Sequence, residues 1–314
     1  MSTVRAVIVT PGAPARLALG NVDLGEPGPS EALIRVAALS LNRGEINRAQ
    51  NEQAGVRIGW DIAGIVERAA VDGSGPPVGS RVVGFLPTAA WGELVAVPTH
   101  ALAILPDTVT FAEAATLPVA GLTALLGLEK AGNLLGRTVL ITGASGGVGD
   151  FAVQLAREAG ANVVALVRSE ERAGRVRAIG AHVVVIGENA SGAAAHGPYD
   201  LVFDGVGGDV LASALPLLAL DGIAVSYGRT IGPTITFDLG QFFGKGGLQL
   251  YGFILFHEVR RHPAGVNLAR LAALIDQKRL QPYISVETSW TEIGAVAQQL
   301  LDRAYPGKAV LLVD

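Results

Sequence analysis

The 314-residue sequence contains no cysteine. This absence excludes disulfide bonds, zinc sites built on thiolates and a cysteine nucleophile. Charged residues make up only 17% of the chain and the formal net charge is −4, which argues against a nucleic-acid-binding surface. No uninterrupted apolar run is long enough to cross a bilayer, and no basic, apolar signal segment opens the sequence. These absences favour a cytoplasmic enzyme with neither nucleic-acid nor membrane partners.

The length and composition of the chain suit a two-domain α/β protein. Hydrophobic residues make up 50% of it, which fits a sheet covered on both faces. Residues 1–120 alternate short apolar runs with Gly- and Pro-rich turns, which indicates a β-rich unit. Residues 121–259 alternate strands with helices, which predicts a doubly wound parallel sheet. Residues 260–314 add helices near 266–277 and 291–305 and an apolar strand over 309–313.

The expected strands are apolar runs bounded by turn residues. In the first stretch they cover residues 4–9, 32–41, 62–69, 81–85, 93–97 and 102–105. In the second stretch they cover residues 139–141, 163–167, 183–186, 201–204, 223–227 and 248–251. The small-residue run 189–197 is expected to be a loop.

A glycine-rich turn follows the strand expected at residues 139–141. It reads Ala144-Ser145-Gly146-Gly147-Val148-Gly149, a variant of G-x-G-x-x-G. In such a turn Gly146 lets the backbone approach a pyrophosphate, and Gly149 lets the next helix pack on the strand. Apolar residues recur on one face of that helix, and Gly160 is placed to end it. The pattern predicts a dinucleotide site whose phosphates meet the helix N-terminus, with an ordinary βα turn as the alternative.

The end of the second strand, residues 163–167, indicates which dinucleotide binds. An NAD site usually places Asp or Glu there, to accept a hydrogen bond from the ribose 2′-hydroxyl. Here the strand is followed by Arg168 and Ser169, with Arg172 about one helical turn further on. A guanidinium and a hydroxyl suit a 2′-phosphate, so these residues favour NADPH over NADH. Glu170 and Glu171 leave a solvated helix start as the alternative.

Motifs in a fixed order extend along nearly the whole chain. They are Leu39–Glu45, Gly59–Gly64, Leu117–Ala124, the glycine turn, Asp204–Gly208 and Gly307–Leu311. As an ordered set, the chain resembles the medium-chain dehydrogenase/reductases, in their zinc-free quinone oxidoreductase and enoyl reductase branch. The resemblance implies a GroES-like substrate domain at 1–120, completed by 260–314, and a Rossmann NADPH-binding domain at 121–259.

The resemblance also bears on metal use. Zinc-dependent relatives hold catalytic zinc with a cysteine and a Gly-His-Glu string, where this chain has Gly59-Trp60-Asp61. None of the five histidines falls in a paired spacing, so no metal site is predicted. Without a Lewis acid, alcohol dehydrogenation loses its usual activating device. The expected reaction is therefore hydride transfer from NADPH to a quinone or an α,β-unsaturated carbonyl.

Individual roles in the N-terminal half also follow from the resemblance. Asn42 is expected near the nicotinamide, bonding the substrate carbonyl or the nicotinamide ribose, with a loop-organising role as the alternative. Thr123 is expected to contact the nicotinamide carboxamide, or else to bond back to its own helix. Asp61 is expected to be a structural carboxylate paired with a nearby arginine. Arg43 and Glu45 line the pocket mouth or belong to a solvated loop.

Four further residues are candidate cofactor contacts by the same resemblance. Tyr227 would flank the adenosine–phosphate portion, and the backbone of Phe253 and Ile254 would meet the nicotinamide. Either aromatic residue could instead be plain packing. Lys308 would reach the cofactor phosphates or ribose, with a surface lysine as the alternative.

One departure from the branch affects the choice of function. Relatives carry a tyrosine in the loop after the matching asparagine, whereas this chain has no aromatic residue between Asn42 and Trp60. No protein-borne proton donor can therefore be named. A nucleotide-binding sensor, or a non-redox tailoring enzyme that uses the cleft for a cyclisation, stays open as the alternative. The apolar segment 248–256 could form a sheet edge that pairs two copies into a homodimer, or it could equally be a strand covered within the monomer.

Overall fold

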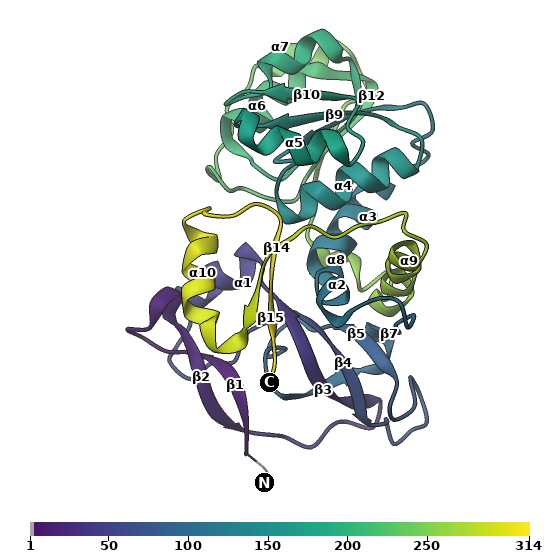
Figure 1. Cartoon of the computed structure of the whole chain (residues 1–314). Helices are drawn as coiled ribbons and strands as arrows, with labels where there is room; N and C mark the ends of the chain where they lie inside the picture. The colour runs from purple at the N-terminus through teal and green to yellow at the C-terminus, as the bar shows by residue number, and fades with distance from the viewer. Residues whose placement is uncertain (1–2) are drawn as a thin grey trace. The chain divides into compact units, whose positions relative to one another are not determined.

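The structure, a computed structural model, describes residues 3–314 apart from the side chains of residues 242 and 243. The chain forms two compact units (Figure 1). The first contains the residues up to Leu122 together with Val259–Asp314, and the second contains Thr123–Glu258. The boundaries predicted from the sequence, 120/121 and 259/260, lie within two residues of these.

The first unit is built mainly on antiparallel strands, with β14 and β15 as a parallel pair. Strands β1 (Thr3–Val9) and β2 (Leu17–Asp23) form a two-stranded sheet, and the others form a seven-stranded sheet in the order β14-β15-β3-β4-β5-β7, with β6 paired to β3. These strands are β3 (Glu31–Ser40), β4 (Asp61–Arg68), β5 (Arg81–Phe85), β6 (Leu94–Pro98), β7 (Leu102–Ile104), β14 (Ile284–Ser289) and β15 (Lys308–Leu312). Because β15 pairs with β3, the C-terminal segment completes the sheet begun by the N-terminal segment.

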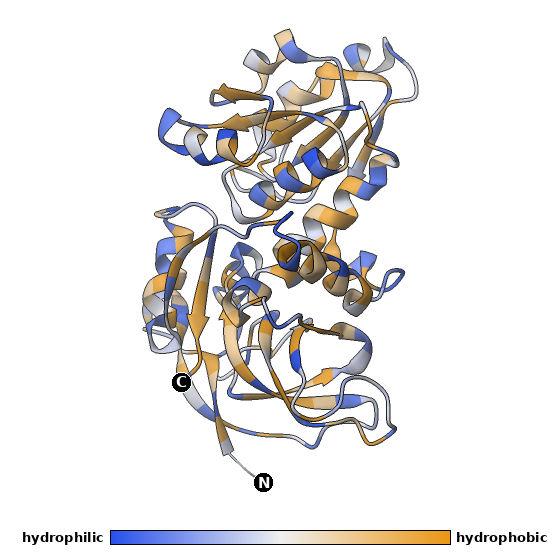
Figure 2. Cartoon of the chain, turned by 45° about the vertical axis from the view of Figure 1, so that its right-hand side comes forward, coloured by the Kyte–Doolittle hydropathy of each residue, from blue (hydrophilic) through white to orange (hydrophobic). Residues whose placement is uncertain are grey.

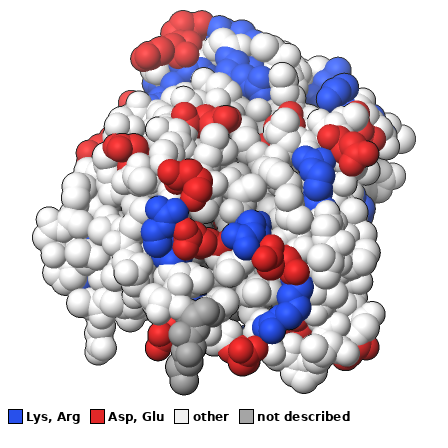
Figure 3. Space-filling view, turned by 60° about the horizontal axis from the view of Figure 1, so that its bottom comes forward, with Lys and Arg blue, Asp and Glu red and all other residues white. Residues whose placement is uncertain are grey.

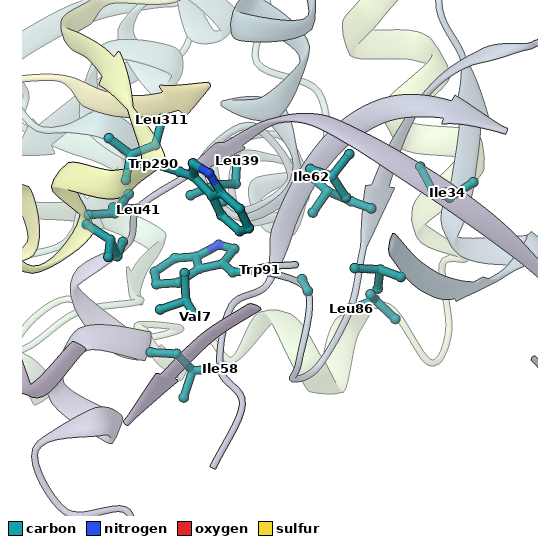
Figure 4. Packing of buried hydrophobic residues seen from close by; sticks show 14 of the residues in the cluster. Val7, Ile34, Leu39, Leu41, Ile58, Ile62, Leu86, Trp91, Trp290 and Leu311 are labelled. Carbon is teal, nitrogen blue, oxygen red and sulfur yellow. The ribbon is translucent and has the colours of Figure 1, made fainter. Parts of the chain in front are cut away.

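Short helices accompany these strands. They are α1 (Arg43–Ala49), α2 (Phe111–Ala115), α9 (Ala264–Asp276) and α10 (Ile293–Leu301), with the π-helical turn η3 (Leu117–Gly121) and the 3-10 turns η1 (Pro14–Arg16), η2 (Thr99–Ala101) and η7 (Trp290–Glu292). Two tryptophans, Trp91 and Trp290, lie fully buried among aliphatic side chains of this unit (Figure 4). The core thus joins residues from both ends of the chain.

The second unit is a parallel sheet in the order β10-β9-β8-β11-β12-β13. Its strands are β8 (Thr138–Thr142), β9 (Asn162–Val167), β10 (Val183–Ile186), β11 (Tyr199–Asp204), β12 (Leu218–Ser226) and β13 (Gln249–Gly252). All its pairings are parallel, and the order reverses between β8 and β11. This is the Rossmann order, in which ligands bind at the carboxyl ends of the strands beside the reversal.

Helices connect the strands of this sheet. They are α4 (Gly147–Glu158), α5 (Glu170–Ala178), α6 (Gly208–Ala214), α7 (Leu239–Phe243) and α8 (Leu255–Glu258), with α3 (Leu122–Leu128) at the start of the unit and the 3-10 turns η4 (Glu129–Ala131), η5 (Ser191–His196) and η6 (Leu215–Leu217). Apolar residues concentrate in the strands, and polar residues on the outer faces of the helices (Figure 2). The α/β class predicted from the sequence is confirmed, whereas residues 191–196 form a 3-10 turn instead of the expected loop.

Two surface properties bear on possible partners. Among residues 3–314, no helix has the length and apolar character needed to span a bilayer. Acidic and basic side chains lie interspersed on the face shown in Figure 3, and ion pairs such as Arg35 with Glu67 join opposite charges on the first unit. The described charges of this face therefore form no single-sign patch of the kind that attracts nucleic acid.

Candidate functional site

The glycine turn joins β8 to α4 in the second unit. Gly143 has φ +60°, and α4 begins after Gly146, which has no side chain that could cap the helix. A Cβ on Gly149 would lie 2.3 Å from the carbonyl oxygen of Gly143, so only glycine allows this close approach of helix and turn. The first N–H groups of a helix have no acceptor within it. The turn therefore presents donors and a positive helix end to an anion.

The other residues of the turn are arranged as the pattern predicts. Ala144 is fully buried, while Ser145, Gly146, Gly147 and Val148 are partly exposed. The apolar face of α4 is buried, and Gly160 follows the helix with φ +81°. The predicted strand, turn and helix are thus all present.

Asp204 holds this edge of the sheet together, a role that no pattern in the sequence predicts. It is buried at the end of β11, where its carboxylate accepts hydrogen bonds from the Thr142 hydroxyl at 2.6 Å and the Gly207 N–H at 3.0 Å. The Ser226 hydroxyl lies 3.4 Å from the same carboxylate. Burial raises the pKa of Asp204, and these hydrogen bonds oppose the rise. Asp204 therefore ties together the carboxyl ends of β8, β11 and β12 beside the glycine turn.

The start of α5 carries the residues expected at a 2′-phosphate. Ser169 is the N-cap residue, but its hydroxyl makes no capping hydrogen bond. Arg168 is exposed and has no acidic partner among residues 3–314, whereas Glu170 is ion-paired with Arg177. Arg172 is partly buried one turn into the helix. The carboxylate of Glu170 is therefore engaged away from Arg168, which leaves that guanidinium available to an anion.

Three further predicted contacts belong to the same unit. The ring of Tyr227 packs on Phe203, with the ring centroids 4.5 Å apart. Burial raises the pKa of Tyr227, and the neighbouring Asp204 charge adds to the rise. Phe253 is buried and its N–H donates to the Ser226 carbonyl, whereas Ile254 is 63% exposed. Both segments follow β12 and β13, so they lie at the carboxyl edge that also holds the glycine turn.

Thr123 begins this unit within α3. Its side chain is largely buried, and its hydroxyl has no hydrogen-bond partner among the described residues. The alternative in which it bonds back to its own helix is therefore not seen.

The first unit contains a buried cluster of charged and amide groups. It consists of Asn42, Glu45, Asp61 and Lys308. The Lys308 ammonium donates to the Leu41 carbonyl at 2.7 Å and to Asn42 Oδ1 at 2.5 Å, and lies 3.5 Å from Asp61. Asn42 Nδ2 donates to Asp61 at 2.7 Å and to Glu45 at 3.1 Å. Both amide protons of Asn42 thus have acceptors within the protein.

Asp61 is the acidic residue of this cluster that accepts hydrogen bonds from the most donors, although it is fully buried. Its oxygens also accept hydrogen bonds from the Val119 N–H at 3.0 Å and the Ser40 hydroxyl at 3.2 Å. Burial raises the pKa of Asp61, while Lys308 and these donors lower it. Burial likewise lowers the pKa of Lys308, against the attraction of Asp61 and Glu45. Donors on every side favour a charged Asp61–Lys308 pair.

Glu45 is fully buried in a different environment. One oxygen accepts from the Asn42 N–H at 2.6 Å, but Oε2 has no partner among the described residues. Burial raises the pKa of Glu45 well above its ordinary range, and the charge on Asp61 raises it further. A neutral Glu45 leaves the cluster with one positive and one negative charge, which is the favourable state in a low-dielectric interior.

These contacts correct four of the alternatives raised by the sequence. Asp61 pairs with Lys308 instead of an arginine, because β15 pairs with β3, which in turn pairs with β4. Lys308 is only 4% exposed, so it is no surface lysine. Glu45 is no part of a solvated loop, since it is fully buried. Arg43 is no part of a solvated loop either, since it begins α1 and its guanidinium donates to the Leu300 carbonyl at 2.6 Å, at the end of α10.

Glu45 was missed as a cluster member although the sequence contains a signal for it. Asn42-x-x-Glu45 has the spacing of a capping box, in which the third helical residue reaches back to the N-cap N–H. The pairing with Lys308 had no such local signal. Elsewhere, no group of three His, Cys, Asp or Glu side chains within the described part of the chain could hold a metal ion.

Comparison with known proteins identifies the family. The Alcohol dehydrogenase GroES-like domain family matches residues 28–125, and the Zinc-binding dehydrogenase family matches residues 147–269. A quinone oxidoreductase of Pseudomonas aeruginosa is 31% identical over 251 residues, which cover 76% of this chain and 77% of that protein.

Two other similarities extend this result. A mycocerosic acid synthase-like polyketide synthase of Mycobacterium tuberculosis is 33% identical over 84% of this chain, which spans only 13% of that protein's length. A mycobacterial protein solved in complex with NADPH superposes with a TM-score of 0.88 at 27% identity, over 98% of this chain and 99% of that one. These similarities confirm the predicted family and fold, and they support a nicotinamide cofactor. The chain belongs to the medium-chain dehydrogenase/reductase family of oxidoreductases, in its quinone oxidoreductase and enoyl reductase branch.

Proposed function

We propose that the protein is an NADPH-dependent reductase that transfers hydride, without a metal, to a quinone or an α,β-unsaturated carbonyl. The carrying observation is the uncapped start of α4 at Gly146 together with Arg168 and Ser169 at the end of β9. The first feature suits a pyrophosphate and the second suits a 2′-phosphate. The bound cofactor would supply the hydride, and the protein would supply binding, orientation and electrostatics.

The geometry of the turn fits this cofactor. A side chain at Gly149 would collide with the backbone of the turn, and Asp204 holds the neighbouring strand ends together. In this proposal, Ser145–Gly149 bind the pyrophosphate, while Arg168, Ser169 and Arg172 bind the 2′-phosphate. The remaining contacts are assigned from the family resemblance. Tyr227 flanks the adenosine portion, and Thr123 and the Phe253–Ile254 backbone meet the nicotinamide.

The buried cluster limits the hydrogen bonds that the Asn42 amide can make to a ligand. Its two amide protons are taken by Asp61 and Glu45, and Lys308 donates to its Oδ1. The amide can therefore accept one further hydrogen bond at Oδ1, but it has no proton left to donate. We assign Asn42 to accepting from a hydroxyl of the nicotinamide ribose instead of donating to a substrate carbonyl. Lys308 then acts by holding Asn42, without reaching the cofactor phosphates.

We also propose that two copies pair as a homodimer in the cytoplasm. Within residues 3–314, strand β13 pairs with β12 alone and is the edge of its sheet, and Leu250 within it is 45% exposed. An apolar edge strand is prone to pair with another strand, so joining two such edges would bury it. Light scattering on the purified chain would give the mass of a dimer, and a monomer mass would overturn this part.

Measurements of NADPH oxidation test the proposed function. The NADPH absorbance is followed with 1,4-benzoquinone and with a series of 2-alkenals, in parallel with NADH and in the presence and absence of a chelator. We expect oxidation of NADPH with at least one of these acceptors, faster than with NADH and insensitive to the chelator. Tight binding of NADPH with no turnover on any acceptor would instead support the nucleotide-binding sensor or the non-redox tailoring enzyme. Loss of activity on chelation would overturn the metal-free mechanism.

A further inference from the structure

Helix α5, which carries the proposed 2′-phosphate site, has few apolar contacts that would fix its position on the sheet. It is nine residues long, and only Ala173 and Val176 are buried. Gly174 lies in its interior, where glycine lowers helix stability relative to alanine. Two small apolar contacts and a glycine do little to fix where such a helix begins.

An ion pair joins this helix to the helix of the glycine turn. Asp150, in the first turn of α4, accepts hydrogen bonds from Arg175 Nε at 2.9 Å and from Arg175 Nη2 at 3.2 Å. The Asp150 side chain is 2% exposed and that of Arg175 is 24% exposed. Gln154 Nε2 donates to the same carboxylate at 2.7 Å. Burial raises the pKa of Asp150, and Arg175 opposes the rise.

The two-point contact fixes both the distance and the orientation of the guanidinium relative to α4. Arg175 lies one turn beyond Arg172 on α5, and Asp150 directly follows Gly149 on α4. The pair therefore connects the helix that receives the pyrophosphate to the helix that receives the 2′-phosphate. A buried carboxylate without its counter-ion is costly, so a shift of α5 that separates Arg175 from Asp150 is disfavoured.

We propose that Asp150 and Arg175 are positioning residues that set the preference for a 2′-phosphorylated nucleotide. They do so by holding Ser169 and Arg172 at a fixed distance from the glycine turn. Neither residue needs to touch the cofactor. This inference rests on the proposed function, because it takes the start of α5 as the 2′-phosphate site.

The test compares two probes that differ only in the 2′-phosphate. Binding of 2′,5′-ADP and of 5′-AMP to the full chain is measured by calorimetry for the unaltered protein and for Asp150→Asn. We expect the variant to bind 2′,5′-ADP about fivefold more weakly, which corresponds to roughly 1 kcal/mol of binding free energy. Binding of 5′-AMP should stay within about twofold, because the glycine turn is unchanged.

Two further variants separate positioning from folding. Arg175→Lys keeps a cation beside Asp150 but loses the two-point contact, so it should fold and still lose part of the preference. Arg137→Gln breaks an exposed pair with Asp200 at the amino end of β8, away from both phosphate sites, and should change neither probe's affinity.

The outcomes distinguish the inference from the proposed function. The positioning role is overturned if Asp150→Asn and Arg175→Lys leave the ratio of the two affinities unchanged, whether or not both affinities fall. The proposed NADPH site would remain intact in that case. Equal binding of the two probes by the unaltered chain would overturn the proposed preference for NADPH itself.

Discussion

In the first unit, Lys308, Asp61 and Glu45 lie buried and bond to one another through Asn42, whereas in the second unit Arg168 is exposed at the start of a helix. The buried groups are almost all satisfied within the protein, which makes them costly to change one at a time. The exposed guanidinium has no acidic partner among residues 3–314. Charged groups therefore stabilise the interior of the first unit, whereas in the second unit an exposed charge is left available to a ligand.

Removing the buried cation should give the largest effect. Lys308→Met leaves Asp61 without its counter-ion, and we expect a loss of about 3–5 kcal/mol in the free energy of unfolding. Chemical denaturation measures this loss. Lys278→Met, at an exposed lysine of the same unit, should stay within about 0.5 kcal/mol.

A double variant sharpens this first prediction. Combining Lys308→Met with Asp61→Asn removes both charges and should regain part of the lost stability, because no unpaired buried charge remains. Equal stability of Lys308→Met and the unaltered chain would contradict the buried pair.

A side chain in the glycine turn should give the next largest effect. Gly149→Ala places a Cβ against the Gly143 carbonyl, and overpacking of this kind costs about 1–3 kcal/mol. We expect weaker NADPH binding as well, measured by fluorescence titration. Gly174→Ala on α5 is the matched control, since its Cβ would meet open space; it should stabilise the chain by about 0.5–1 kcal/mol.

Neutralising the exposed arginine should change ligand preference without changing stability. Arg168→Gln removes the proposed charge-assisted contact to the 2′-phosphate, which should weaken NADPH binding about tenfold, or roughly 1.4 kcal/mol. NADH binding should remain within about twofold. An equal loss for both nucleotides would place Arg168 away from the 2′-phosphate.

Near pH 5, Glu45→Gln should change the free energy of unfolding less than Lys308→Met or Gly149→Ala. Because its pKa is raised in the folded state, that state binds more protons than the unfolded chain above the ordinary glutamate pKa of 4.5. Stability then falls as the pH rises from that value toward the raised pKa. Glu45→Gln should match the unaltered chain near pH 5 and exceed it increasingly toward alkaline pH. Parallel stability curves for the two proteins would show that Glu45 is charged throughout.

The sequence predicted elements whose signal is local. Strand β8, the glycine turn and α4 were all expected, because a short apolar run, a glycine pattern and one apolar helix face lie next to each other in the chain. Strand β2 was missed, since Leu17–Asp23 is partly polar and contains a glycine. Helix α1 was missed because Arg43–Ala49 is too short to show a helical period.

The same holds for the candidate site: its local features could be predicted from the sequence, and its long-range contacts could not. The glycine turn and the arginines after β9 could be predicted from residues that are neighbours in the sequence. By contrast, Lys308 meets Asn42 across 266 positions of the chain, and only the pairing of β15 with β3 brings them together. Likewise, no local pattern shows that Asp204 would tie three strand ends together.

Transfer of deuterium from labelled NADPH tests the central claim most directly. The chain is incubated with NADPH that carries deuterium at C4 of the nicotinamide, in either stereochemical position, and with a 2-alkenal that supports turnover. Mass spectrometry of the saturated product should find one deuterium from only one of the two labelled cofactors, because a bound nicotinamide presents a single face. A reduced product without deuterium from either cofactor would contradict hydride transfer from NADPH.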